Sequence, residues 1–400
     1  MTGNITKIHG GGRAGGLAPS AVFVARDRET HFEGFRGEIV ARKPGDVMDC
    51  LRRVEEAVAD GLHAAGYLAY EAAAAFDSAL SVYPPDTLPL VWFGLYESRR
   101  VVNKTTAIPG GMFRTGDWIP EIERPEYERA ILRIKDLIGA GDTYQVNYTF
   151  GLTAEFAGDP YAWFQAMCRA QNGDHAAYID LGPFQVVSAS PELFFRLDGS
   201  VLETRPMKGT RPRGLTKASD ARLRDELARS EKDRAENLMI VDLLRNDMGR
   251  ISETGSVEVT DLFRVERYGT VWQMVTGIRS RIHHNVPDIF RALFPSGSVT
   301  GAPKVRAMQI IHELEQSARG VYCGTVGWWS AERQAQFNVG IRTAVVDQTA
   351  SLARYCVGGG ITWESSPEGE YEECLTKSAI LSAAASNCSN RCCSTSSISS

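Results

Sequence analysis

The sequence predicts an α+β fold built on antiparallel β-sheet, and three observations lead to this fold class. Segments with alternating apolar and polar residues follow one another along the chain, as in a meander of antiparallel strands. Helical segments stand between groups of strands. The regular strand–helix–strand alternation of a doubly wound parallel sheet is missing from the sequence. With 400 residues, of which 43% are hydrophobic, the chain can bury a large core and form roughly two or three domains.

The two ends of the chain differ in composition from the rest. Residues 1–20 are rich in glycine and are expected to be disordered. Gly10, Gly12 and Gly15 have the spacing of a dinucleotide-binding loop, but such a loop needs an apolar strand before it, which this sequence does not supply. Residues 386–400 form a low-complexity Ser/Cys tail that is also expected to be disordered.

Two regions of regular structure are expected between these ends. Residues 21–115 form an N-terminal α+β region, with strands at 21–25 and 90–96 and a helix at 47–59. Residues 116–385 form a larger region that begins with a helix at 127–138. The remaining elements expected there are helices at 217–230, 233–246 and 304–316, strands at 144–150, 176–181, 184–189, 193–197, 269–281, 320–330, 336–346 and 351–357, and a tight turn at Asp198-Gly199.

Composition excludes several classes of function. The net charge of −5 gives no basic footprint for nucleic acid. The sequence contains no run of about 18 apolar residues, so no membrane span is expected, and its start lacks the apolar stretch of a secretory signal. Its eight cysteines are scattered singly or crowded into the tail, without zinc-ligand spacing. Reduced thiols in a cytoplasmic protein are expected.

A basic loop at residues 205–214 is the first candidate for chemistry. It places Lys208 among Arg205, Arg211 and Arg213, in a segment broken by two prolines and two glycines. Composition alone leaves two interpretations open. The loop is either a solvated basic turn or an anion site with an amine nucleophile.

Two helical segments carry spaced carboxylates. Asp233 and Glu236 are three residues apart, as are Glu370 and Glu373, so each pair shares one helical face. Lys377 lies on the same face as Glu373. The two helices either clamp a hard divalent cation such as Mg²⁺ or present solvated acidic faces.

Two glycine-rich segments are candidate ligand-binding turns. Residues 294–304 lack the ending of a phosphate loop, but a turn that leads into a helix is a good place for a substrate carboxylate. In residues 357–362, Gly358, Gly359 and Gly360 allow a ligand to approach the backbone closely.

Taken together, these segments resemble the chorismate-binding enzymes, a family that includes anthranilate synthase component I, aminodeoxychorismate synthase component I, and the isochorismate and salicylate synthases. The resemblance covers residues 127–385 and follows the order of the family's motifs. The motifs are GDTYQVNYT, SASPELFF, RPMKGTRPRG, AENLMIVDLLRND, FPSGSVTGAPK, GVYCGTVGW, FNVGIRTAVV and GGGITWESSPEGEYEECLTKS. It implies large antiparallel sheets packed as a sandwich with peripheral helices, and a chorismate-binding catalytic domain at 116–385.

Two positions indicate the branch of the family. The resemblance implies that Lys208 stands where aminodeoxychorismate synthases carry Lys and anthranilate synthases typically carry Ala. Gln145 stands where isochorismate and salicylate synthases carry a water-activating Lys. An aminodeoxychorismate synthase component I in 4-aminobenzoate and folate biosynthesis is therefore expected. The alternatives are an anthranilate synthase component I and a catalytically silent chorismate-binding subunit.

The resemblance also implies roles for the reacting groups. Mg²⁺ would be held by Glu236 and Glu373, with Asp233 and Glu370 supporting it through water. Lys208 would add to ring carbon C2, and Glu192 would protonate the departing C4 hydroxyl. An unperturbed lysine is almost wholly protonated at neutral pH. Lys208 is therefore expected to be partly desolvated or to lie near other cations that lower its pKa, and the three arginines of the basic loop are candidates for such cations.

Further residues are implied to bind substrate. Arg342 and Tyr322 match positions that hold the enolpyruvyl carboxylate. Other matching positions lie around the ring carboxylate: Thr210, Gly358, Gly359, Gly360 and Lys377. Gln273 departs from the family, because several relatives have a His there, near the reacting C4.

The nitrogen source is expected to be a second protein. No segment resembles a glutamine amidotransferase, so ammonia would come from a separate glutamine amidotransferase subunit, and free ammonium should replace it. A clear match to tryptophan-binding elements is missing from the N-terminal region. Feedback inhibition by tryptophan is therefore not expected.

Overall fold

An antiparallel sheet of 18 strands dominates the computed structural model, and a second sheet has three strands. The structure describes residues 20–389 except 26, 104–110, 172 and 270, and for 382–389 it describes the backbone alone. The predicted α+β class is confirmed. The expectations for residues 1–19, including the Gly10–Gly15 pattern, and for residues 390–400 lie outside this range.

The strands of the large sheet pair in one continuous path. In order across the sheet they are β13, β16, β11, β10, β19, β18, β3, β4, β2, β1, β8, β9, β20, β21 and β7, with β17, β6 and β5 also paired to β7. Strands of the predicted N-terminal region thus pair directly with strands of the larger one.

The bounds of these strands are β1 Ala21–Val24, β2 Arg28–Ala41, β3 His63–Leu68, β4 Val91–Asn103, β5 Phe113–Thr115, β6 Ile119–Pro120, β7 Gln145–Gly158, β8 Ala176–Asp180, β9 Phe184–Ser188, β10 Leu193–Asp198, β11 Val201–Arg205, β13 Glu258–Val259, β16 Ile278–Arg281, β17 Gly301–Ala302, β18 Thr325–Ser330, β19 Gln334–Val339, β20 Thr343–Asp347 and β21 Leu352–Ile361. The small sheet contains β12 Met207–Pro212, β14 Arg264–Arg267 and β15 Val271–Val275, with β15 in the middle.

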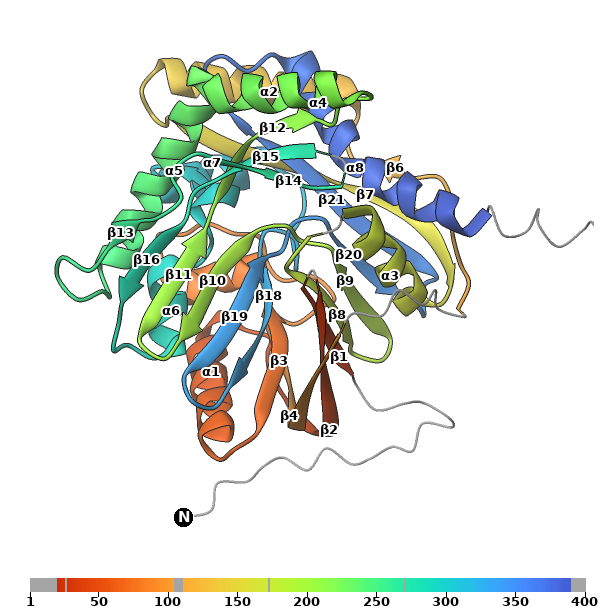
Figure 1. Ribbon diagram of the computed structural model, residues 1–400, viewed down its shortest axis with the longest axis vertical. Coiled ribbons are helices and arrows are strands. Elements are labelled where there is room, and N and C mark those ends of the chain that lie inside the picture. Colours follow the sequence, from red (N-terminus) through yellow and green to blue (C-terminus); the bar gives the residue numbers. More distant parts are fainter. Residues whose placement is uncertain (1–19, 26, 104–110, 172, 270, 390–400) are drawn as a thin grey trace, which may run out of the picture.

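The helices cover the outside of the large sheet (Figure 1). They are α1 Pro44–Ala59, α2 Arg124–Gly139, α3 Pro160–Gln171, α4 Lys217–Arg229, α5 Glu231–Gly249, α6 Val286–Leu293, α7 Lys304–Leu314 and α8 Pro367–Ser389, with short 3₁₀ turns η1 Tyr70–Ala75 and η2 Gly297–Val299. Helices α1, α5 and α6 share a core with β10, β11 and β19. Helices α2, α3, α7 and α8 share one with β7, β20 and β21.

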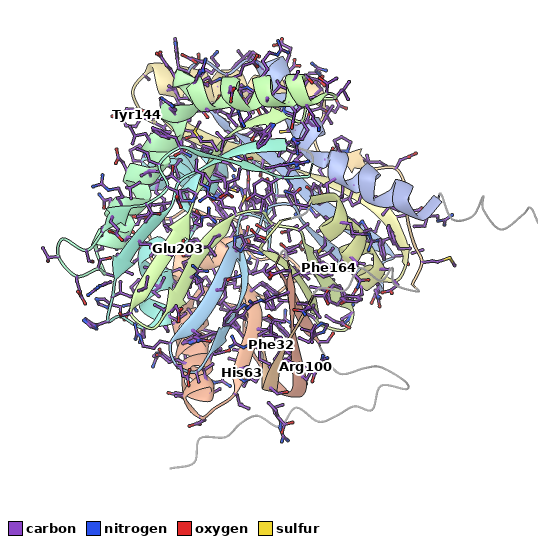
Figure 2. The ribbon with its side chains drawn as sticks, viewed as in Figure 1. Phe32, His63, Arg100, Tyr144, Phe164 and Glu203 are labelled. Carbon is purple, nitrogen blue, oxygen red and sulfur yellow. The ribbon has the colours of Figure 1, made fainter. Side chains whose placement is uncertain are left out.

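The middle strands of the large sheet share a third core. It includes Phe32 of β2, whereas Phe164 of α3 belongs to the helix-covered core of β7 (Figure 2). Large apolar side chains such as Tyr67 and Trp163 are fully buried in these cores. Each contributes on the order of 2 kcal/mol of hydrophobic free energy. The two halves of the sheet pack as the predicted sandwich.

The start of helix α5 is set by a side-chain cap. Ser230 is its N-cap, and the Ser230 hydroxyl accepts a hydrogen bond from the backbone N–H of Asp233 at 3.2 Å. Such a cap satisfies a backbone donor that the first helical turn leaves open. It therefore fixes the direction in which Asp233 and Glu236 project.

Several predicted elements have different bounds. The expected strand at 269–281 is two strands in different sheets, and the one at 336–346 divides into β19 and β20. At the second break Arg342 has a φ of +51°, and Gly340 lies so close to the Val321 carbonyl that a side chain would collide with it. Apolar alternation continues through such a break, so sequence periodicity does not detect it.

Two further predictions of extent are corrected. The strand expected at 320–330 begins only at Thr325, because residues 320–323 form a turn in which Gly320 and Cys323 have positive φ. Helix α8 continues to Ser389, so residues 386–389 of the expected disordered tail are helical. In the part of the chain described, every helix is too short or too polar to cross a bilayer.

Candidate functional site

The candidate site lies where the small sheet faces the glycine-rich end of β21. Figure 1 shows β12, β15 and β14 beneath α4, and β12 and β15 also contact α5. Strand β21 pairs with β7 so that Gly360 lies opposite Asn147 and Gly358 opposite Thr149. These elements bring together residues that lie far apart in the sequence.

Lys208 reaches this site from β12. Its Nζ atom donates a hydrogen bond to the carbonyl oxygen of Ser298 at 3.1 Å. A Cβ atom at Gly360 would lie 3.1 Å from that Nζ and would collide with Nε2 of Gln145. The Lys208 amine, the Gln145 amide and Gly360 are therefore neighbours.

Burial lowers the pKa of the Lys208 amine, and the nearby Lys377 lowers it further. Glu236 and Glu192 oppose this shift, but the net direction is downward. Of the two causes expected from the sequence, burial is the one found, whereas the arginines of the basic loop do not contribute and each pairs with a carboxylate. Arg205 pairs with Glu266 at 2.7 Å, Arg211 with Asp233 at 2.8 Å and Arg213 with Asp220 at 2.5 Å.

Glu192 approaches the same point from the start of β10. Its side chain is buried and accepts hydrogen bonds from the Ser298 hydroxyl and the Met207 backbone amide. Burial raises the pKa of this carboxyl to about 7, although these hydrogen bonds and the Lys208 charge act in the opposite direction. A carboxyl with a pKa near neutrality can hold a proton and deliver it.

Ser298 joins these two groups, because its carbonyl binds Lys208 and its hydroxyl binds Glu192. The segment around it is held by its own polar atoms. The Ser296 and Ser298 hydroxyls lie 3.0 Å apart, and the Thr300 hydroxyl donates to the Ser296 carbonyl at 3.1 Å. A side chain at Gly297 would lie 2.5 Å from a methyl group of Leu243. The turn at 294–304, proposed from the sequence as a carboxylate site, contacts the two candidate catalytic residues.

The four predicted metal-binding carboxylates come from α5 and α8. Burial raises the pKa of Glu236, and the charges of Asp233 and Glu370 raise it further, so the two helices present their carboxylates to one another. Glu370 accepts a hydrogen bond from the Ser365 hydroxyl at 2.6 Å. The Lys377 ammonium lies 2.7 Å from Glu373 and lowers the pKa of that carboxyl.

These carboxylates fit a hard cation only together with other ligands. Among the residues described, no three or more His, Cys, Asp or Glu side chains are grouped closely enough to hold a metal ion. Glu370 Oε2 is nevertheless buried without a hydrogen-bond partner and faces the Gly359 position, where a Cβ would lie 2.8 Å away. An open carboxylate oxygen suits Mg²⁺, which takes one or two protein carboxylates and completes its shell with water and substrate oxygens.

The predicted substrate-binding residues surround the same strand. Lys377 donates to the Gly358 carbonyl at 2.8 Å, and an Arg342 guanidinium nitrogen donates to the Lys377 carbonyl. Tyr322 is buried, and burial raises the pKa of its hydroxyl well above the usual range, so it stays a neutral hydrogen-bond donor. The Thr210 hydroxyl bonds the side chain of Gln273 at 2.9 Å.

Sequence reasoning missed two residues of the site. Ser298 is an uncharged residue in a turn, and nothing in its spacing identifies it. Lys232 lies 4.0 Å from Glu236 and lowers the pKa of Glu236, Glu370 and Glu373. The four-residue spacing between Lys232 and Glu236 could have identified this second residue.

Residues 9–383 match the family described as chorismate binding enzyme. The chain is 44% identical over 262 residues to an aminodeoxychorismate synthase of Streptomyces griseus, covering 65% of this chain and 36% of that protein. It is 39% identical over 253 residues to aminodeoxychorismate synthase component 1 of Bacillus subtilis, covering 63% of this chain and 53% of that protein. It is also 39% identical over 267 residues to anthranilate synthase component 1 of Aquifex aeolicus, covering 66% and 54%. The matched part thus spans between a third and rather more than half of these relatives' lengths.

Solved structures agree in fold. A putative 2,3-dihydroxybenzoate-specific isochorismate synthase of Bacillus anthracis superposes with a TM-score of 0.75 at 22% identity, covering 91% of this chain and 96% of the other. Anthranilate synthase component I of Streptococcus pneumoniae superposes with a TM-score of 0.73 at 24% identity, covering 92% and 93%. The fold implied by the sequence motifs is therefore confirmed.

Proposed function

The chain belongs to the chorismate binding enzyme family, and we propose that it converts chorismate and ammonia into 4-amino-4-deoxychorismate, the reaction of an aminodeoxychorismate synthase component 1. The observation that carries the proposal is that the Lys208 amine, with its lowered pKa, and the Glu192 carboxyl both contact Ser298 and lie near each other. An amine nucleophile and a proton donor are what replacement of a poor hydroxyl leaving group needs.

In the proposed reaction, the neutral Lys208 amine forms a bond to ring carbon C2. The ring double bonds shift, and the C4–oxygen bond breaks as Glu192 gives its proton to the departing oxygen, which leaves as water. Ammonia then forms a bond to C4, the double bonds shift back, and the C2–nitrogen bond breaks with its electron pair returning to Lys208. The new C4 ammonium returns a proton to Glu192.

We propose Mg²⁺ as the cofactor, with Glu236 and Glu373 as direct ligands and Asp233 and Glu370 supporting it through water. When bound, the cation would neutralise the ring carboxylate and withdraw electron density from the ring. The unpartnered Glu370 oxygen and the convergence of α5 and α8 support this assignment. Glu373 must release the Lys377 ammonium to become a ligand, which leaves that ammonium available to a substrate carboxylate.

The remaining substrate contacts follow from the same geometry. Arg342 and Tyr322 would bind the enolpyruvyl carboxylate, and a planar guanidinium is suited to a carboxylate. The glycines of β21 and Lys377 would bind the ring carboxylate, since strand residues without side chains let a ligand approach the backbone. Thr210 belongs to the same group of proposed contacts.

We propose that ammonia comes from a separate glutamine amidotransferase subunit. The Bacillus subtilis relative is named component 1, which supports the existence of a second component. Four cysteines of the described chain, at 50, 323, 356 and 374, are free and buried. A thiol that attacks glutamine must be reachable. The proposal fails if the purified chain alone hydrolyses glutamine efficiently.

An anthranilate synthase component 1 is the second candidate, because the Aquifex aeolicus relative is as similar as the Bacillus subtilis one. The two candidates differ in product. The anthranilate reaction releases pyruvate, whereas the proposed reaction retains the enolpyruvyl group.

The deciding experiment is incubation of the chain with chorismate, Mg²⁺ and ammonium, with product masses read directly. We expect 4-amino-4-deoxychorismate and no free pyruvate. Formation of anthranilate with pyruvate would support the second candidate, and the absence of any aminated product would reject both.

A further inference from the structure

The turn that carries Lys208 is an irregular part of its strand. The pairing of β12 with β15 is regular at Thr210, opposite Gln273, but shifts in register between Met207 and Thr210. Within this shift Gly209 has a φ of +88°, and a Cβ there would lie 2.9 Å from the Asp233 side chain. Lys208 and Gly209 therefore lie in a bulge, where strand pairing does not supply all the hydrogen bonds.

The side chain of Gln273 supplies the missing bonds. Its Nε2 donates to the Gly209 carbonyl at 2.9 Å, and its Oε1 accepts from the Thr210 hydroxyl at 2.9 Å. The orientation of the amide is fixed by chemistry, because a carbonyl can only accept. Nε2 must face Gly209, so Oε1 faces Thr210, and the Thr210 hydroxyl must donate its single proton to it.

This polarity determines which ligand the Thr210 hydroxyl can bind. With its proton committed to Gln273, the oxygen can only accept, so it cannot donate to a carboxylate. Ammonia has N–H groups to donate, and a hydrogen bond through one of them leaves the nitrogen lone pair free to attack. The C4 hydroxyl is the competing donor, and the KM values for ammonium and for chorismate distinguish the two.

We propose that Gln273 is a positioning residue that holds the Lys208 turn and orients the Thr210 hydroxyl as an acceptor for ammonia. This inference rests on the proposed function for its ligand, but the positioning role does not depend on that function. At this position several relatives have a histidine, and here a glutamine amide supplies both the donor and the acceptor that the bulge uses.

The test compares three variants of the full chain. Gln273→Met removes both hydrogen bonds at nearly constant volume. Gln273→Glu can form both hydrogen bonds only while its carboxyl is protonated. In the ionised form a carboxylate oxygen would face the Gly209 carbonyl oxygen, and neither can donate. Gln334→Met is the matched control. Gln334 on β19 also accepts a hydrogen bond from a side chain of another strand, Arg99 of β4 at 3.0 Å, but it does not contact β12.

The first measurement is hydrogen–deuterium exchange of the peptide 207–212, relative to the unaltered chain at the same pH. We expect faster exchange in Gln273→Met, unchanged exchange in Gln334→Met, and exchange in Gln273→Glu that becomes faster as pH rises. Unchanged exchange in Gln273→Met overturns the positioning role. This result needs no enzymatic activity, so it is separate from failure of the proposed function.

The second measurement is steady-state kinetics with chorismate and ammonium. In Gln273→Met we expect the KM for ammonium to rise by about threefold to tenfold, the equivalent of one hydrogen bond, with the KM for chorismate within about twofold. Gln273→Glu should behave like the unaltered chain at low pH and like the Met variant at high pH. A rise in the chorismate KM alone would overturn the assignment of ammonia to Thr210. If the unaltered chain gives no aminated product, the proposed function fails, and exchange still decides the positioning role.

Discussion

Lys208 and Arg319 are two cations that hold adjacent carbonyls of one turn, Ser298 and Val299, but their surroundings differ. Arg319 is 4% exposed. Its guanidinium donates to the Val299 carbonyl at 2.8 Å, the Asn147 carbonyl at 2.7 Å and both oxygens of Glu315 at 2.6 and 2.8 Å. Among the residues that the structure describes, Lys208 donates one hydrogen bond, to Ser298, and has no carboxylate within ion-pair distance. The Arg319 guanidinium therefore has a partner on each of its nitrogens, whereas the Lys208 amine can still form further hydrogen bonds.

The glutamates of the two clusters show the same contrast. Burial raises the pKa of both Glu71 and Glu192 to about 7. Glu71 accepts the backbone amides of Arg319 at 2.7 Å and Gly320 at 3.1 Å, which tie η1 to the turn before β18. Glu192 instead lies beside Lys208. A shifted pKa alone therefore does not identify a catalytic residue. Glu192 is the better candidate because it lies beside Lys208, whose amine has few hydrogen-bond partners.

The comparison predicts the largest effect at Lys208. Lys208→Ala should lower kcat by at least about a thousandfold, as expected for removal of a group that forms a covalent bond with substrate. The urea midpoint should change little, because the side chain has few partners to lose. Lys217→Ala, an exposed lysine on α4, is the control. Unchanged formation of 4-amino-4-deoxychorismate would remove Lys208 from the covalent role.

Glu192→Gln should lower kcat by about 10² to 10⁴, the range of a general acid. The sign of the pH dependence follows from its role. Glu192 is active when protonated, and its raised pKa of about 7 means that it loses this proton as pH rises, so the rate should fall above pH 7. The pH profile of kcat should lose this descending limb in the Gln variant. A limb that persists belongs to another group.

The opposite result, a loss of stability, is expected when the buried pair of Arg319 and Glu315 is broken. Arg319→Met should lower the free energy of unfolding by about 3–5 kcal/mol, because it leaves the Glu315 carboxylate buried without its partner. Urea titration gives this value, and Arg36→Met, from an exposed pair with Glu97, should cost less than about 1 kcal/mol. If Arg319→Met folded with normal stability but had no activity, the structural role given to Arg319 and Glu315 would be wrong.

The smallest expected effect concerns the carboxylates of α5 and α8. Lys232 lies 4.0 Å from Glu236 and is half exposed, so its charge would compete weakly with the proposed cation. A unit charge at this distance in water is equivalent to about 1 kcal/mol, or roughly fivefold in affinity. Titration calorimetry should show that Lys232→Met binds Mg²⁺ about that much more tightly, whereas Arg222→Met on α4 does not. Weaker binding in Lys232→Met would contradict competition.

The sequence motifs identified the residues that meet at the site but not their hydrogen-bond partners. The resemblance to the family implied that Lys208, Glu236 and Glu373 belong to one site, whereas the spacing of the carboxylates alone left that open. The pairing of Arg213 with Asp220 and of Gln273 with Thr210 depends on strand register and helix docking. Residue periodicity does not encode these. For the same reason the expected strand at 336–346 did not reveal the break at Arg342.

The glycine run of β21 restricts how this chain can vary. A Cβ at position 358 would lie 2.5 Å from the Thr149 side chain, one at 359 would lie 2.8 Å from Glu370 Oε2, and one at 360 would collide with Gln145. Even alanine, the smallest replacement, would push a polar group out of place or break the pairing with β7. We therefore expect a saturation library over these three codons to return glycine at each under selection for growth without supplied 4-aminobenzoate. Substitutions are expected to be tolerated elsewhere on β21 but not at these three positions.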